Sequence, residues 1–214
     1  MATKSGWYPE FLMPVVAAIM ASSGHKQILD IGTGPGTLPQ MLIKRAPDLY
    51  ISGIDTSTVM IDEAKRGLTH QNVFFQHRKA NTSLEFSNNR FDTITFCSVL
   101  FLMDDVAKVN LINEALRVLK PGGTLLILTP SGKKSILSSF TEVWKYPFSL
   151  NNFTFIIWKI ATTKRARLWR KQGWLSQFSI EKKMNYSVQT VFNNNAILET
   201  ISNKIKFTGN ESTN

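Results

Sequence analysis

Short runs of β-branched and aromatic residues alternate with helix-patterned segments through the first 130 residues, and this alternation constrains the fold more than any other feature. Such alternation is typical of βαβ units, in which helices connect the strands of a parallel sheet. The pattern therefore predicts an α/β fold with helices on both faces of the sheet. The predicted strands are residues 27–31, 50–54, 73–77, 91–97 and 124–129, and the predicted helices are residues 11–21, 37–46, 57–68 and 104–119.

The pattern changes after Pro130, where serine, aromatic and basic residues become frequent. Two helical stretches are expected between residues 135 and 171, and two last strands at 178–186 and 196–201, joined by a short turn that makes them pair antiparallel. A chain of 214 residues suits one domain. We divide this domain, 1–207, into an N-terminal cap helix (1–26), a cofactor-binding core (27–130), a basic and aromatic lid insertion (131–176) and a terminal strand pair (177–207), followed by a tail (208–214).

The chain has one cysteine, Cys97, which limits the classes of protein to which it can belong. One cysteine forms neither an internal disulfide nor a multi-thiolate metal site, so we expect a cytoplasmic protein without a metal. The apolar run at residues 11–21 resembles a signal-peptide core, but Glu10 and Pro14 favour a helix packed on the domain. No apolar run reaches the ~18 to 20 residues of a membrane-spanning helix.

Positive charge gathers in the last third of the chain. The sequence carries 25 basic and 15 acidic residues, and 13 of the basic but only 4 of the acidic residues follow residue 130. Two interpretations stay open. The basic part contacts an anionic partner, such as a phosphate-bearing substrate, a nucleic acid or a membrane surface, or it is a solvated surface that aids solubility.

A glycine-rich turn follows the first predicted strand, in the sequence I-L-D-I-G-T-G-P-G at residues 28–36. Glycines let the backbone turn tightly and let a ligand approach closely, and the following helix offers free N–H groups. The spacing G-x-G-x-G differs from the G-x-G-x-x-G of dinucleotide-binding turns, and Pro35 removes a backbone donor that a pyrophosphate would use. The turn therefore predicts a ligand site, but not a dinucleotide site.

Two carboxylates belong to the same pattern. Asp30 ends the first strand, where it would repel a pyrophosphate but hold a cationic or neutral group. Asp55 ends the second strand, where a carboxylate typically binds ribose hydroxyls in nucleoside-binding α/β folds. A turn cap for Asp30 and a helix N-cap for Asp55 are the structural alternatives. Together with the glycines between them, the two acids favour a nucleoside ligand.

Four ordered motifs resemble the class I S-adenosylmethionine-dependent methyltransferases, especially the small-molecule, type 11-like branch that includes quinone-type methyltransferases. They are L-D-I-G-T-G-P-G at 29–36, S-G-I-D-T-S-T-V-M-I-D-E-A-K at 52–65, R-F-D-T-I-T-F-C-S-V-L at 90–100 and L-R-V-L-K-P-G-G-T-L-L-I at 116–127. The resemblance covers residues 27–130. It implies a Rossmann-like, mostly parallel seven-stranded sheet in the order 3-2-1-4-5-7-6, with S-adenosylmethionine as cofactor and S-adenosylhomocysteine as its product.

The same resemblance implies the residues of the cofactor site. Asp30 and the backbone from Gly32 to Gly34 would hold the methionine part, and Asp55 would hold the ribose. Met60 would cover the adenine, and Cys97 would form a pocket wall rather than act as a nucleophile. The full set of implied cofactor-binding residues is Asp30, Gly32, Thr33, Gly34, Gly36, Asp55, Thr56, Met60, Ala80, Asn81 and Cys97.

The stretch H-R-K-A-N-T-S-L-E-F at 77–86 departs from the family pattern. Many relatives have an aspartate there that accepts a hydrogen bond from the adenine amino group. Lys79 or Ala80 takes its place here, and neither side chain accepts such a bond, which leaves Asn81 or a backbone carbonyl as the substitute. Losing one charged acceptor costs about 1.5 to 3 kcal/mol, so the departure predicts weakened cofactor binding.

Methyl transfer from a sulfonium is an in-line displacement that mainly requires alignment of the acceptor, so no fixed base motif is expected and no catalytic residue is assigned. His25, His70 and His77 lie at positions typical of structural or exposed histidines. Trp7 and Tyr8 are candidates for a substrate lid, with helix anchoring as the alternative.

Several acceptor classes are disfavoured by the residues themselves. Cys97-Ser98-Val99-Leu100 replaces the Asp/Asn-Pro-Pro-Tyr type motif of amino-group DNA methyltransferases, and Phe96, not proline, precedes the single thiol. A small organic or lipid-like acceptor remains, and the oligomeric state is left open. Segment 153–174, apolar and then basic, predicts either peripheral contact with an anionic membrane or a lid helix. An RNA methyltransferase and a catalytically silent, cofactor-binding or scaffolding protein are the alternative functions.

Overall fold

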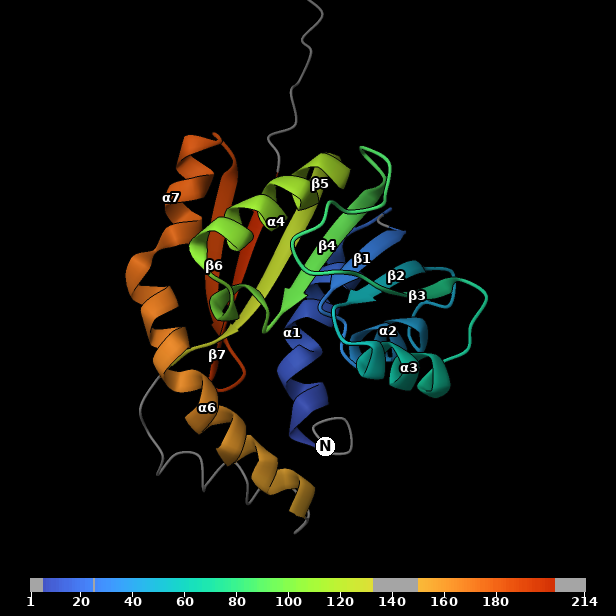
Figure 1. Ribbon diagram of the computed structural model, residues 1–214, viewed down its shortest axis with the longest axis horizontal. Helices are drawn as coiled ribbons and strands as arrows, with labels where there is room; N and C mark the ends of the chain where they lie inside the picture. Colours follow the sequence, from blue (N-terminus) through green and yellow to red (C-terminus); the bar gives the residue numbers. More distant parts are fainter. Residues whose placement is uncertain (1–5, 25, 133–149, 203–214) are drawn as a thin grey trace, which may run out of the picture.

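The computed structural model describes residues 6–24, 26–132 and 150–202, and these form one mostly parallel sheet between layers of helices (Figure 1). The strand order is β3-β2-β1-β4-β5-β7-β6, as predicted. Neighbouring strands from β3 to β5 pair in parallel, whereas β7 pairs antiparallel with both β5 and β6. The strands are β1 Gln27–Ile31, β2 Tyr50–Asp55, β3 Val73–His77, β4 Phe91–Cys97, β5 Leu119–Pro130, β6 Asn185–Val191 and β7 Ala196–Ser202.

Helices connect these strands, and local capping explains where several of them begin. Ser57 accepts a hydrogen bond from the N–H of Met60 at the start of α3, and Asp104 accepts one from the N–H of Ala107 at the start of α4. The helices are α1 Trp7–Ala21, α2 Thr37–Ile43, α3 Thr58–Gly67, the 3₁₀ turn η2 Leu100–Leu102, α4 Asp105–Val118, α6 Leu150–Gln172 and α7 Trp174–Glu181. Among these helices, none is long and apolar enough to cross a membrane.

Buried side chains form a large cluster on each face of the sheet. On β1, Leu29 belongs to one cluster and Ile28 to the other, because successive side chains of a strand point to opposite faces. Helices α4 and α7 cover the face of Leu29, and α1 and α2 cover the face of Ile28 (Figure 1). The sheet is therefore buried on both sides, which explains the continuous apolar runs of its central strands.

Helix α6 contributes to both clusters. Phe155, near its amino end, packs with α1, whereas Ala166 and Trp169 pack with α4. The helix thus passes the carboxyl edge of the sheet from one face to the other (Figure 1). It also approaches the chain just after β5, because a Cβ on Gly132 would lie 2.7 Å from the backbone N of Arg167. Only glycine fits there without a shift of the helix.

The prediction of a strand at 178–186 is wrong. Residues up to Glu181 belong to α7, Lys183 ends this helix with a φ of 54°, and β6 begins only at Asn185. Phe178 is buried while Ile180 is 73% exposed, which is a helical pattern rather than a strand pattern. The helix also crosses the predicted boundary at residue 177. The predicted helical residues 135–149, the tail 208–214 and His25 lie outside the described residues.

A buried carboxylate ties the last strands to α6. Glu199 on β7 accepts a hydrogen bond from Tyr186 Oη at 2.7 Å and one from Trp169 Nε1 at 2.8 Å. Burial raises the pKa of the Glu199 carboxyl, although both hydrogen bonds oppose this shift. The acid therefore satisfies the buried Trp169 donor, which would otherwise lack a partner, and the partly buried Tyr186 hydroxyl.

Replacing Glu199 with leucine should destabilise the protein, because the Trp169 and Tyr186 donors lose their acceptor. We expect a loss of about 1 to 3 kcal/mol in the free energy of unfolding, measured by urea denaturation. Glu199→Gln keeps one acceptor and should lose less, and Glu181→Gln, on the exposed end of α7, is the control. Equal stability of Glu199→Leu and the wild type would contradict this role.

Candidate functional site

The glycine-rich turn between β1 and α2 is held against the end of β2. The N–H groups of Gly32 and Thr33 both donate to the carbonyl of Ile54, at 2.8 and 3.0 Å. Gly32 has a φ of 76°, and a Cβ there would collide with the side chain of Val99. Glycine is therefore required both by the backbone conformation and by the close approach of the loop after β4.

Asp55, at the end of β2, braces this turn. Its Oδ2 accepts a hydrogen bond from the N–H of Gly34 and its Oδ1 one from the N–H of Ser57, both at 2.9 Å. The N-cap of α3 is Ser57, so Asp55 is not the helix cap that the sequence left as an alternative and instead accepts a hydrogen bond just before the helix. Asp55 remains partly exposed and lines a cavity at the carboxyl edge of the sheet. Its carboxylate thus faces the space where a ligand would lie.

Asp30 lies at the end of β1 and is only 2% exposed. Its Oδ1 accepts a hydrogen bond from Thr95 Oγ1 on β4 at 2.7 Å. Burial raises the pKa of the Asp30 carboxyl to about 6, although the Thr95 hydroxyl lowers it in part. An acid that is costly to ionise and lies next to a glycine turn is a candidate for a site that receives a positive group.

A cavity of about 400 Å³ opens at the carboxyl edge and brings together several of the predicted residues. It is lined by Gly32, Asp55, Thr56, Ala80 and Cys97. The other predicted residues, Asp30, Thr33, Gly34, Gly36 and Met60, lie outside this lining, on β1, in the turn and in the first turn of α3. Asn81 instead lines an adjoining cavity of about 350 Å³ beside α4.

The cavity also has walls that the sequence did not single out. Ser98, Val99, Leu102 and Met103 come from the loop and the 3₁₀ turn after β4, and Arg78 follows β3. The loop residues directly follow Cys97, the last residue of β4. Their place just after a strand end in the sequence could have indicated that they line the site. Arg78 directly precedes Lys79, one of the two residues that take the place of the family's adenine-binding aspartate.

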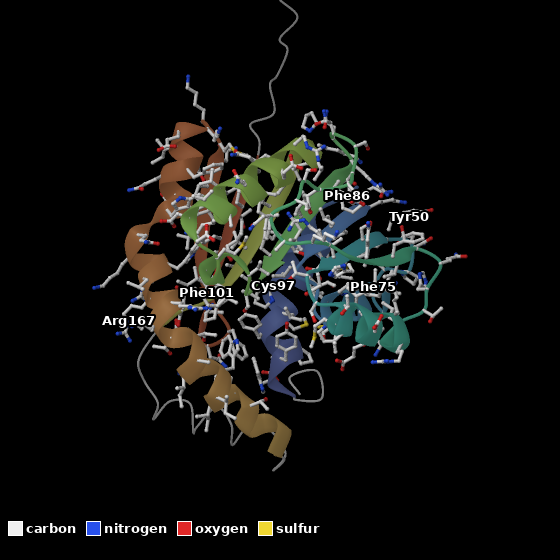
Figure 2. The ribbon with its side chains drawn as sticks, in the orientation of Figure 1. Tyr50, Phe75, Phe86, Cys97, Phe101 and Arg167 are labelled. Carbon is white, nitrogen blue, oxygen red and sulfur yellow. The ribbon has the colours of Figure 1, made fainter. Side chains whose placement is uncertain are left out.

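Cys97 lies at the carboxyl end of β4, at the centre of the molecule (Figure 2). It is 8% exposed, and burial, helped by the nearby Asp30, raises the pKa of its thiol well above the usual range. The thiol therefore stays protonated and is a poor nucleophile, in keeping with a wall residue.

The amino end of α1 reaches the same edge through aromatic side chains. Trp7 is 1% exposed and its Nε1 donates to Thr154 Oγ1 on α6 at 3.0 Å, so it anchors α1 to α6. Its ring also contacts Phe155 and Trp158. Trp7 thus takes the anchoring role that the sequence left open. Tyr8 is partly exposed, and burial raises the pKa of its phenol far above the usual range, with Cys97 and Asp30 adding to the effect.

Two of the three histidines lie in the described residues, and neither lines the cavity of about 400 Å³. His70 Nδ1 accepts from the N–H of Asn72, and His77 Nε2 lies 3.2 Å from the carbonyl of Thr56. Within the part of the chain that the structure describes, no three His, Cys, Asp or Glu side chains gather into a metal-binding group.

Comparison with known proteins agrees with this geometry. Residues 28–123 match the family model described as a methyltransferase domain. Over 130 residues the chain is 34% identical to the ubiquinone/menaquinone biosynthesis C-methyltransferase UbiE of Desulfotalea psychrophila, a match that covers 60% of this chain and 52% of the relative. The demethylmenaquinone methyltransferase of Thermus thermophilus is 34% identical over 104 residues, or 48% of this chain and 46% of the relative. The chain spans about half the length of the curated relatives it matches.

Solved structures extend the similarity of fold to most of the chain. The crystal structure of a SAM-dependent methyltransferase from Aquifex aeolicus covers 92% of this chain and 89% of its own, with a TM-score of 0.62 at 17% identity. The plantazolicin methyltransferase BpumL, crystallised with a triazolic desmethylPZN analog and SAH, has a TM-score of 0.63 at 16% identity, and the match covers 91% of this chain and 83% of that one. With the sheet order, these similarities show that the chain has the fold of these methyltransferases, and residues 28–123 match the methyltransferase-domain model.

Proposed function

We propose that this chain binds S-adenosylmethionine in the cavity at the carboxyl edge of the sheet and transfers its methyl group to a small organic acceptor. The observation that carries the proposal is the meeting of Gly32, Asp55 and Cys97 around one cavity of about 400 Å³. This space is of the size that a nucleoside-containing ligand requires. The family match and the relatives named as methyltransferases support the same reaction.

The proposed arrangement of the cofactor follows the turn and the two acids. The methionine part lies against Gly32 and Gly34, with Asp30 beneath them, because its positive ammonium group would relieve the cost of ionising that buried acid. Asp55 holds the ribose hydroxyls. The residues proposed around them are Thr33, Gly36, Thr56, Met60, Ala80, Asn81 and Cys97.

The chemistry needs alignment more than an activated protein group. The acceptor atom attacks the methyl carbon, the carbon–sulfur bond breaks, and its electron pair stays on sulfur as neutral S-adenosylhomocysteine. The acceptor then loses a proton to solvent or to a base. The Tyr8 phenol, with its raised pKa, stays protonated and is therefore not this base.

An aromatic, lipid-like acceptor fits the apolar part of the cavity best. Val99, Leu102 and Met103 form this part next to Cys97. Two relatives at 34% identity are named as a ubiquinone/menaquinone biosynthesis C-methyltransferase and a demethylmenaquinone methyltransferase, which supports a quinone-type ring as the acceptor class.

One face of α6 supports peripheral binding to a bilayer, where the protein would meet a lipid-like acceptor. Ile157, Ile160 and Leu168 are 66%, 64% and 53% exposed, and they alternate along the helix with the exposed Lys164 and Lys171. Apolar and basic side chains on one helix face are typical of peripheral binding to anionic lipids. A purely RNA-binding surface has no need of exposed isoleucines, so this pattern disfavours the RNA methyltransferase alternative.

Replacing Asp55 with alanine should weaken binding of S-adenosylhomocysteine by about 100-fold, because the ribose loses a charged acceptor and Gly34 loses its brace. Isothermal titration calorimetry measures this change. Asp62→Ala, an exposed acid on α3, should bind like the wild type. If wild type gives no heat while its fold is intact, the scaffold alternative replaces the enzyme.

Replacing Asp30 with asparagine should stabilise the free protein at pH 7 and weaken cofactor binding. The folded pKa of about 6 lies above the usual 3.8, so the carboxyl costs nothing below pH 4, and its cost grows to about 3 kcal/mol above pH 6. Urea denaturation should therefore show a gain of about 1 to 3 kcal/mol for Asp30→Asn at pH 7 and no gain near pH 4. A lower stability of Asp30→Asn than of the wild type at pH 7 would show that ionisation of the buried Asp30 carboxyl does not destabilise the fold.

The wild type should be retained on vesicles that contain phosphatidylglycerol but not on phosphatidylcholine alone. Ile157→Ser/Ile160→Ser should lower this retention by about 30-fold or more, because each side chain that enters the bilayer contributes about 1 kcal/mol or more to the partition. Val106→Ser, an equally exposed residue on α4, is the control for a flotation assay. Unchanged retention of the double variant would exclude this face of α6 as the contact.

A further inference from the structure

We propose that Arg78 reads the base of the bound nucleoside and makes that end of the cavity a hydrogen-bond donor, so that the site does not select adenine over a 6-oxo purine. This inference rests on the proposed function. Asp55 is assigned to the ribose, so the base extends beyond it, toward the residues that follow β3. Arg78 and Ala80 are the lining residues of the cavity from that segment.

The backbone places Arg78 beside Asp55. Its N–H donates to the carbonyl of Asp55 at 2.9 Å, which continues the pairing of β3 with β2 by one residue. Arg78 also lines two further cavities, of about 240 and 350 Å³. It is therefore shared by all three of these cavities.

The charge of Arg78 has no ion-pair partner among the described residues. Glu114 is the acid that faces it, but both oxygens of Glu114 are already occupied by Arg117, at 2.8 and 2.9 Å, and by the N–H of Leu84. Arg78 Nη2 donates to the carbonyl of Thr82, and Arg78 Nε is buried with no acceptor in the described part of the chain. The guanidinium thus keeps donor capacity that a ligand acceptor would satisfy.

Besides Arg78, the charged residue in the lining of this cavity is Asp55, and its carboxylate is assigned to the ribose hydroxyls. Arginine has only donors, so it cannot accept a bond from the amino group of adenine. It can donate to a ring nitrogen of any purine, stack on the purine face, and donate to the carbonyl oxygen at position 6 of hypoxanthine. A donor at this place therefore favours a 6-oxo purine at least as much as adenine.

Calorimetric titration with S-adenosylhomocysteine and with S-inosylhomocysteine, its 6-oxo analogue, tests the inference in the full-length wild type. We expect the inosyl compound to bind at least as tightly as the adenosyl compound. Arg78→Ala should weaken binding of the inosyl compound by about 10- to 100-fold, and Arg78→Asp, which offers an acceptor, should shift the preference to the adenosyl compound by about tenfold or more. Lys65→Ala, an exposed cation near the end of α3, should change neither affinity.

The wild-type comparison keeps the inference falsifiable even if an Arg78 variant does not fold. Adenosyl binding more than about tenfold tighter than inosyl binding in the wild type would overturn it. If S-adenosylhomocysteine binds, Asp55→Ala removes that binding and Arg78→Ala leaves the ratio of affinities unchanged, the proposed function stands and the role of Arg78 falls. If neither compound binds the wild type, both fall.

Discussion

The attachment of the glycine-rich turn to β2 is the constraint on which the site depends. Gly32 and Thr33 share the carbonyl of Ile54, and Gly34 donates to the Asp55 carboxylate. These bonds turn the chain away from the sheet before α2 begins and leave space above the carboxyl ends of β1, β2 and β4. In open α/β sheets this edge is where ligands bind, beside the point at which strand order reverses. The same few bonds thus create both the turn and the cavity.

Much of this core could be predicted from the sequence because the signals are local. The strands at 73–77 and 91–97 have the predicted bounds, since each is an apolar or β-branched run that ends at polar or turn-forming residues. Asp30 and Asp55 were singled out because a strand end next to glycines restricts what a carboxylate there can do. Their hydrogen-bond partners Thr95 and Gly34 depend on strand pairing and turn geometry, and no local pattern encodes them.

The errors have the opposite origin, because they depend on contacts between distant segments. Phe178 and Ile180 fit an alternating pattern as well as a helical one, and only the core beneath α7 decides between them. Arg78 was passed over in favour of Lys79, since the position of the loop after β3 is set by one backbone bond to Asp55. A shift of one residue in that loop exchanges one side chain at the cavity for another.

Helix α6 also has a mechanical consequence. Its amino half is bound to the aromatic residues of α1, its carboxyl half is buried with α4, and Gly132 touches the backbone between them at Arg167. Because both halves are packed and the middle of the helix lies against Gly132, α6 cannot shift at one end alone. A displacement of its amino half near Ile157 would change the packing around Trp169, so the attachment of α1 and the tightness of the core are coupled through one helix.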